Sequence, residues 1–268
     1  MNFAETEEQA SVRAMVRDFA ENEIRPGVAQ REKSGEFPAA VCAKMGELGL
    51  MGMMVAPEWG GAGLDALSYV IAVEEVARVC ASTAVTMSVN NSVFCYPVQT
   101  FGTEEQKRTI LSETASGRAL GAYMLTEPQS GSDAANQKTR AVKKGDRYVL
   151  NGAKAWITNA GVARWLLTMA MTEPEKGTRG ISAFLVDAST PGVRIGAPED
   201  KMGLRASKTA MVFLEDVEVP ESHRLGAEGD GFAIAMKTLD HSRIGIAAQA
   251  VGIARACFEE ARAYAKTR

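Results

Sequence analysis

The sequence is poor in several residue types and patterns that mark particular functions. Its 268 residues include only two histidines, His223 and His241, too few and too far apart for a metal cluster. The net charge of −3 does not indicate the excess of basic residues that nucleic-acid binding requires. No apolar run reaches the ~18 residues of a membrane-spanning helix. These absences argue against a metal site, nucleic-acid binding and a membrane span.

Cysteine is scarce too, and no CxxC pair occurs. We expect buried free thiols in a reducing compartment, because each cysteine lies in an apolar or helical stretch. The cysteines are Cys42, Cys80, Cys95 and Cys257. Residues 1–5 lack the basic and apolar segments of a secretory signal. Together these observations predict a cytoplasmic protein.

Hydrophobic periodicity divides the chain into three parts. Residues 1–118 follow a helical period, and capping boxes at Thr6–Gln9 and Thr103–Gln106 open two of the helices. Residues 119–228 contain short β-rich runs separated by turns, typical of a small sandwich or barrel. Residues 229–268 form one helix of about 35 residues, or about 50 Å, which needs a bundle to bury its apolar side. The predicted fold class is α+β multidomain: an N-terminal helical domain, a middle β-barrel or sandwich domain, and the start of a C-terminal helical bundle.

Local signals also predict where some helices begin and end. Arg25-Pro26 is expected to close the first helix, and Asp65 to cap a later one. Gly61-x-Gly63-x-x-Ala66 fits the glycine pattern of a dinucleotide-binding turn. Because Pro57-Glu58-Trp59 separates it from the preceding apolar run, and no acidic residue follows about 20 positions on, we interpret it as a turn between helices.

Two polar segments carry the chemistry. The segment Leu125–Asp133 follows an apolar run, and its small residues allow a ligand to approach the backbone. Consecutive backbone N–H groups in such a loop can hold an anion such as a pyrophosphate. The segment Lys154–Asn159 offers the indole of Trp156 and the hydroxyl of Thr158, which suit a flat ring. Together the segments predict a flat cofactor with a phosphate tail.

At these residues the chain resembles the acyl-CoA dehydrogenase family. Residues 125–133 read Leu-Thr-Glu-Pro-x-x-Gly-Ser-Asp, and residues 154–159 read Lys-x-Trp-Ile-Thr-Asn, which are the two flavin-contacting patterns of that family. The resemblance extends over essentially all of the chain and is strongest to the short-chain, butyryl-CoA-like branch. It implies FAD-dependent oxidation of an acyl-CoA to trans-2-enoyl-CoA. It also implies electron transfer to an electron-transferring flavoprotein, and a homo-oligomer, either a dimer or a tetramer.

The resemblance also implies site residues. Those implied to bind FAD are Tyr123, Leu125, Thr126, Gly131, Ser132, Trp156, Ile157 and Thr158. Those implied to bind acyl-CoA are Ser132, Leu239, Asp240 and Arg243. A solvated helical ion pair is the alternative reading of Asp240 and Arg243, which lie three residues apart. Glu127 is implied to be structural, and His241 is expected on the helix surface.

No residue within 1–268 matches the family's catalytic glutamate. Ser242 stands where some branches place it, so we expect the base beyond Arg268. The alternatives are a catalytically silent flavin- and CoA-binding subunit and an acyl-CoA oxidase-type relative. Tyr96 either shortens the acyl tunnel or fills a helix kink beside Pro97.

Overall fold

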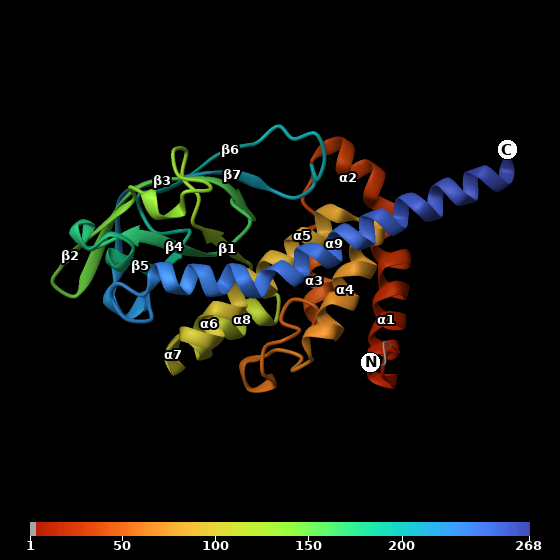
Figure 1. Ribbon diagram of the computed structural model, residues 1–268, viewed down its shortest axis with the longest axis horizontal. Helices are drawn as coiled ribbons and strands as arrows, with labels where there is room; N and C mark the ends of the chain where they lie inside the picture. Colours follow the sequence, from red (N-terminus) through yellow and green to blue (C-terminus); the bar gives the residue numbers. More distant parts are fainter. Residues whose placement is uncertain (1–3) are drawn as a thin grey trace.

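The computed structural model describes residues 4–268. Helices form the first part of the described chain, a β-sheet the middle, and one long helix the end (Figure 1). This order confirms the predicted fold class, whereas the domain limits at 118 and 228 stay predictions. Residues 1–3, part of the stretch read as lacking a secretory signal, lie outside the description. Among residues 4–268, no helix combines the length and the apolar character needed to cross a membrane.

The N-terminal helices precede the sheet in the chain. They are α1 (Glu7–Phe19), α2 (Val28–Ser34), α3 (Ala39–Glu47), α4 (Ala66–Val79), α5 (Ala81–Ser88), α6 (Tyr96–Phe101), α7 (Glu104–Gln106) and α8 (Ser112–Ala115). Short π-helical segments join several of them, and Val89–Cys95 connects α5 to α6. Both predicted capping boxes form, and the carboxylate of Asp65 accepts a hydrogen bond from the backbone N–H of Ser68.

The first helical segment ends where the sequence predicts. After α1 a π-helical segment, Ala20–Ile24, completes it, and a separate 3-10 turn, Arg25–Gly27, leads into α2. Pro26 is the second residue of that turn, where a missing backbone N–H removes no helical hydrogen bond.

The described strands form one mixed sheet with the order β6-β7-β3-β2-β4-β5-β8, and β1 pairs in parallel with β4. The strands are β1 (Gly121–Met124), β2 (Arg140–Lys144), β3 (Arg147–Thr158), β4 (Trp165–Met171), β5 (Ile181–Asp187), β6 (Val193–Pro198), β7 (Thr209–Pro220) and β8 (Arg224–Leu225). β4 and β5 are buried along almost their whole length. Their apolar side chains pack against helices as well as against the sheet.

The start of β1 is fixed by amide side chains on both sides. The N–H of Gly121 donates to Oδ1 of Asn90 at 2.8 Å, and its carbonyl accepts from Nδ2 of Asn159 at 3.1 Å. A Cβ at position 121 would lie 1.9 Å from the ring of Phe94. Only glycine therefore fits at this junction between the helices and the sheet.

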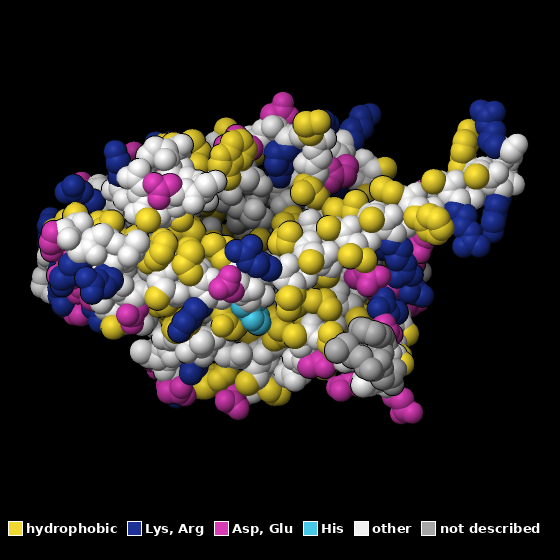
Figure 2. Space-filling view, in the orientation of Figure 1, with side chains coloured by type: hydrophobic (Ala, Val, Ile, Leu, Met, Phe, Trp, Pro, Cys, Tyr) yellow, Lys and Arg dark blue, Asp and Glu magenta, His cyan; other side chains and the backbone are white. Residues whose placement is uncertain are grey.

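The final helix, α9 (Gly231–Thr267), crosses both halves of the molecule (Figure 1). It lies close against α4, since a Cβ at Gly252 would lie 2.4 Å from the carbonyl oxygen of Glu74. Farther along, α9 extends beyond the body with apolar side chains along it (Figure 2), and Phe258 and Tyr264 are exposed there. Cys257 is also exposed, so the expectation of a buried thiol is wrong at this position.

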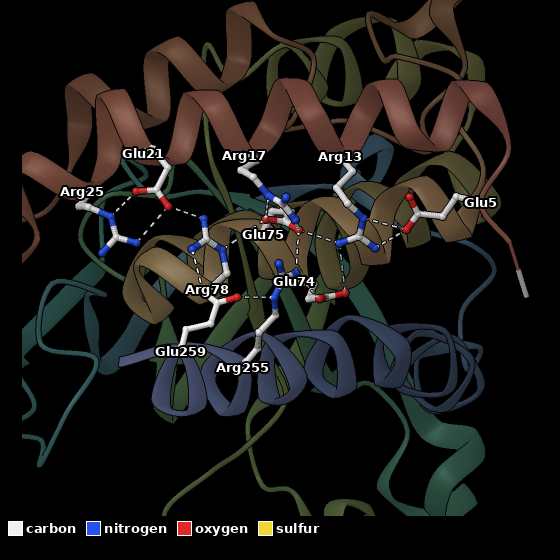
Figure 3. Close-up of polar contacts among 10 residues, drawn as sticks. All are labelled: Glu5, Arg13, Arg17, Glu21, Arg25, Glu74, Glu75, Arg78, Arg255 and Glu259. Carbon is white, nitrogen blue, oxygen red and sulfur yellow. Dashed lines mark hydrogen bonds and ion pairs between the residues drawn. The ribbon is translucent and has the colours of Figure 1, made fainter. Parts of the chain in front are cut away.

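Charged side chains join α1, α4 and α9 (Figure 3). Glu75 of α4 has no exposed surface, and four guanidinium groups surround its carboxylate. Arg13 and Arg17 approach it from α1 at 2.6 and 2.8 Å, Arg255 from α9 at 3.0 Å, and Arg78 from α4 itself at 3.4 Å. Burial alone would raise the pKa of Glu75, but its hydrogen bonds to Arg17 and Arg13 lower it to about 2. The carboxylate thus stays charged and ties the three helices together.

Candidate functional site

A cavity of about 500 Å³ lies where the sheet meets the helices. The loop after β1, the end of β3, the π-helical segment after α5 and the first half of α9 all contribute to its wall. The lining residues are Val89, Val93, Tyr123, Leu125, Thr126, Gly131, Ser132, Ala134, Trp156, Ile157, Thr158, Met236, Leu239 and Arg243. The structure thus brings together all the predicted cofactor-binding residues, although the two segments are separated by about twenty residues in sequence.

The first wall is the loop that follows β1. Leu125 and Thr126 directly follow β1, which pairs in parallel with the buried strand β4. A turn closes behind them, in which the backbone groups of Glu127 and Ser130 exchange hydrogen bonds of 3.0 Å. A Cβ built at Gly131 meets no atom within 4 Å, so the fold itself leaves space over this backbone.

The second wall is the end of β3, where the pairing with β7 is irregular between Lys154 and Ile157. Trp156 lies in this irregularity with a φ of +60°, a conformation that bulky residues rarely adopt. Its indole is 62% exposed, although tryptophan usually buries most of its surface. The backbone N–H of Ala155 donates to the carbonyl of Thr126 at 2.9 Å and so joins the two walls.

A buried ion pair lies directly behind these walls. Nζ of Lys154 contacts a carboxylate oxygen of Glu127 at 2.8 Å, and neither side chain has more than 2% of its surface exposed. Burial alone would raise the pKa of Glu127, but Lys154 and the hydrogen bonds from residues 138 and 139 lower it to about 2. Glu127 does not line the cavity, which agrees with its predicted structural role.

The third wall is α9, which supplies Met236, Leu239 and Arg243. Asp240 is outside the lining and forms an ion pair of 3.4 Å with Arg243, in which both side chains are more than 70% exposed. The solvated ion pair, left as an alternative from sequence, is therefore what the structure contains. A role of Asp240 in binding acyl-CoA stays a prediction.

His241 and Tyr96 form a further contact between α9 and the N-terminal helices. Their rings stack with centroids 3.7 Å apart, so His241 is half-buried and not on the open surface as expected. Burial lowers the pKa of this imidazole. Tyr96 does not line the cavity, so its observed role is packing beside Pro97.

Four lining residues were not among those predicted from the sequence: Val89, Val93, Ala134 and Met236. Val89 and Val93 lie four residues apart on the π-helical segment and face the cavity together. The helix around them is buried on nearly all sides, so apolar periodicity could not mark one face. Met236 is one helical turn before Leu239, a spacing that could have indicated it.

The lining fits FAD, which combines a flat ring system with a pyrophosphate. Trp156 offers an exposed aromatic face, and Gly131 leaves its backbone open to a phosphate. The hydroxyls of Thr126, Ser132 and Thr158 have no hydrogen-bond partner among residues 4–268, and so are available to a ligand. Arg243 is the charged residue of this lining, which therefore suits an anion.

Comparisons with known proteins identify the same class. Models of the acyl-CoA dehydrogenase N-terminal, middle and C-terminal domains match residues 6–118, 122–217 and 229–268. The chain is 51% identical to the short-chain specific acyl-CoA dehydrogenase of Clostridium acetobutylicum, over the whole chain and 71% of that protein. The chain belongs to the acyl-CoA dehydrogenase family, a class of FAD-dependent oxidoreductases.

Solved structures agree with this assignment. Butyryl-CoA dehydrogenase from Megasphaera elsdenii has a TM-score of 0.97 and 43% identity, and the match covers all of this chain and 71% of that one. A chain in a structure of the electron transferring flavoprotein of Acidaminococcus fermentans has a TM-score of 0.98 and 47% identity, covering 100% and 70%. The predicted family, enzyme class and FAD cofactor are confirmed at this level, while the individual site residues stay predictions.

Proposed function

We propose that this chain holds FAD and a short-chain acyl-CoA in the cavity described above, and that the protein oxidises the thioester to trans-2-enoyl-CoA. The observation that carries the proposal is that the loop after β1, the end of β3 and α9 all line one cavity of about 500 Å³. The relatives support the short-chain preference, because the matched proteins carry short-chain and butyryl-CoA names.

Each wall has a distinct proposed task. Trp156, Ile157 and Thr158 cover the flavin ring, while Thr126 and Leu125 contact its pyrimidine end beside Tyr123. Ser132 and the open backbone at Gly131 hold the pyrophosphate, and Ser132 also reaches the thioester arm.

On the opposite side, α9 receives the acyl-CoA. Leu239 and Met236 pack against its apolar portion, and Arg243 binds a phosphate or carbonyl oxygen with a charge-assisted hydrogen bond.

The reaction needs a hydride acceptor and a base. FAD, when bound, accepts the hydride from the β-carbon of the thioester, while a carboxylate must remove the α-proton. The lining contains no Asp, Glu or His, so the residues around the cavity orient the substrate and exclude water but do not take the proton. The catalytic glutamate beyond Arg268 stays a prediction.

Partners follow from the same proposal. The match to a chain in an electron transferring flavoprotein structure supports such a flavoprotein as the electron acceptor. A dimer or tetramer fits the apolar side chains exposed along α9, and the cytoplasmic location stays a prediction.

Anaerobic titration of the purified, FAD-loaded protein with butyryl-CoA tests the proposal. In the unmutated protein we expect butyryl-CoA to bleach the flavin absorbance. In Arg243→Ala we expect the substrate to bind at least about 10-fold more weakly than to the unmutated protein, because a charge-assisted hydrogen bond is lost. Arg262→Ala, on an exposed part of the same helix, is the matched control.

Three other outcomes would redirect the proposal. A folded protein that does not bind FAD would overturn the proposed function. FAD that binds without being reduced by any acyl-CoA would favour the silent subunit. Rapid reoxidation of the reduced protein in air would favour an oxidase.

A further inference from the structure

Lys154 is the most completely buried charged residue next to the cavity, and all its contacts lie in the segment after β1. Its side chain has no exposed surface. Nζ donates to the carbonyl of Leu125 at 3.1 Å, to the carboxylate of Glu127 at 2.8 Å and to Oε1 of Gln137 at 3.1 Å. An ammonium group has three protons, so each of them has one acceptor.

Glu127 extends the same junction in the other direction. One carboxylate oxygen accepts from the backbone N–H of Thr139 at 3.0 Å, and the other from that of Lys138 at 2.6 Å. The Gln129 amide also donates to this carboxylate at 2.6 Å. The pair therefore holds both ends of the loop that carries Thr126, Gly131 and Ser132, because it is tied to Leu125 before the loop and to residues 137–139 after it.

Lys154 is also the last regular residue of β3 before the irregularity. Two positions later, Trp156 has a φ of +60° with its indole turned outward. Such a conformation persists only where the surroundings enforce it. The contacts next to it are those of the Lys154 side chain, on the other side of Ala155, and the 2.9 Å hydrogen bond from the Ala155 N–H to the carbonyl of Thr126.

We propose that the buried pair of Lys154 and Glu127 is a positioning device for the cofactor site. The pair sets the spacing between the loop wall and the β3 wall, and it holds Trp156 in its outward conformation before any ligand arrives. This inference rests on the proposed function, because it assumes that FAD occupies the space between those walls. Neither side chain contacts the ligand, so both are positioning residues.

A purely stabilising role would be an inefficient use of such a pair. Charges lose much of their hydration on burial, and an uncharged pair of similar shape is often as stable. An ion pair with hydrogen bonds in fixed directions does, however, fix the relative positions of the segments that it joins. Besides each other, Lys154 and Glu127 contact five partners in and around the loop. The two roles therefore separate when both charges are removed together.

Three variants make this separation. Lys154→Met leaves the Glu127 carboxylate buried without its cation, so we expect a large loss of thermal stability. Glu127→Gln leaves the ammonium without its anion. The double variant Lys154→Met with Glu127→Gln removes both charges and keeps an oxygen for the N–H of Thr139. Lys143→Met is the matched control, because Lys143, on the neighbouring strand β2, forms an exposed ion pair of 2.8 Å with Glu221.

Two readouts are measured beside thermal stability. The first is the dissociation constant of FAD from the apoprotein. The second is quenching by acrylamide of Trp156 fluorescence in the apoprotein, isolated by subtracting the signal of Trp156→Phe. In the double variant we expect the thermal stability to return most of the way to that of the unmutated protein. We expect FAD to bind at least about 10-fold more weakly than to the unmutated protein, and the quenching of Trp156 fluorescence to differ from that of the unmutated protein. Lys143→Met should change none of these.

Two results would overturn the inference. One is a double variant that regains stability and FAD affinity together; the other is any folded variant of the pair with unchanged FAD affinity and unchanged Trp156 quenching. If the single variants do not fold, the double variant decides. If the unmutated protein itself refuses FAD, the proposed function fails, while the quenching of Trp156 in the apoprotein still tests the positioning.

Discussion

Replacing Glu75 by glutamine removes the one carboxylate that four guanidinium groups all contact in the junction of α1, α4 and α9 (Figure 3). Three of these arginines still pair with other carboxylates of the junction, namely those of Glu5, Glu21, Glu74 and Glu259. Glutamine has nearly the same shape, so the substitution isolates charge from packing. Removing one partner of a buried ion pair typically costs about 3–5 kcal/mol, because the other charge is left without compensation.

The arginines around Glu75 differ in their access to water, and this sets the expected size of the effect. The side chains of Arg13, Arg17 and Arg255 are 22, 44 and 30% exposed, so water screens part of their repulsion, whereas Arg78 is only 9% exposed. We therefore expect the lower end of that range, about 3 kcal/mol. For a protein of this size, such a loss lowers the melting temperature by about 6–12 °C.

Thermal and urea unfolding of the purified protein, followed by circular dichroism, measures this loss. Glu105→Gln is the matched control, because Glu105 forms an ion pair with Arg108 in which both side chains are mostly exposed. Such a pair contributes little to stability. Equal unfolding free energies for Glu75→Gln and Glu105→Gln would refute the argument that the buried carboxylate holds the three helices together.

Three further predictions concern acid stability, helix packing and thiol chemistry. The pKa of Glu75 falls from its ordinary 4.5 to about 2 on folding, so its contribution, up to about 3 kcal/mol, is full above pH 4.5 and is lost as the pH falls toward 2. Unfolding free energies measured from pH 5 to pH 2.5 should therefore fall less steeply in Glu75→Gln. Gly252→Val should lower the unfolding free energy by about 2 kcal/mol in a denaturant titration, since its Cβ would lie 2.4 Å from a backbone oxygen of α4. In the native protein one thiol, Cys257, should react rapidly with an aromatic disulfide reagent, because burial raises the pKa of Cys42 and Cys95 to about 12.

Each of these predictions has a result that contradicts it. Identical acid profiles for the unmutated protein and Glu75→Gln would show that this carboxylate does not cause the acid sensitivity. Ala254→Val, on the exposed side of α9, is the control for Gly252→Val, and equal effects of the two would argue against close packing of α4 on α9. Two rapidly reacting thiols would show that a second cysteine is accessible.

Local signals in the sequence predicted much of the fold because they depend on few residues. The capping boxes at Thr6 and Thr103 both form, since each needs only four consecutive residues. Arg25-Pro26 marks the end of the first helical segment, because a proline is tolerated in the first turn of a helix but not in its interior. The strand Val193–Pro198 has only a weak signal in the sequence, because it carries a glycine, ends in a proline and is only partly buried.

The candidate site was predictable in part for the same reason. Two polar segments of suitable chemistry indicated one ligand, and the structure places both segments around one cavity. The outward conformation of Trp156 was not predictable, because it lies where the pairing register of β3 and β7 shifts, and that shift has no local sequence signal. The partnership of Lys154 with Glu127 was not predictable either, because it depends on how the loop after β1 lies against β3.

The glycine at position 121 has a consequence for how this sequence can vary. Its N–H and its carbonyl each form a hydrogen bond with an asparagine side chain, and the ring of Phe94 fills the space that a side chain would need. The two hydrogen bonds go to backbone atoms, so a side chain at this position conflicts with the ring of Phe94 alone. Natural variants should therefore replace Gly121 only together with Phe94.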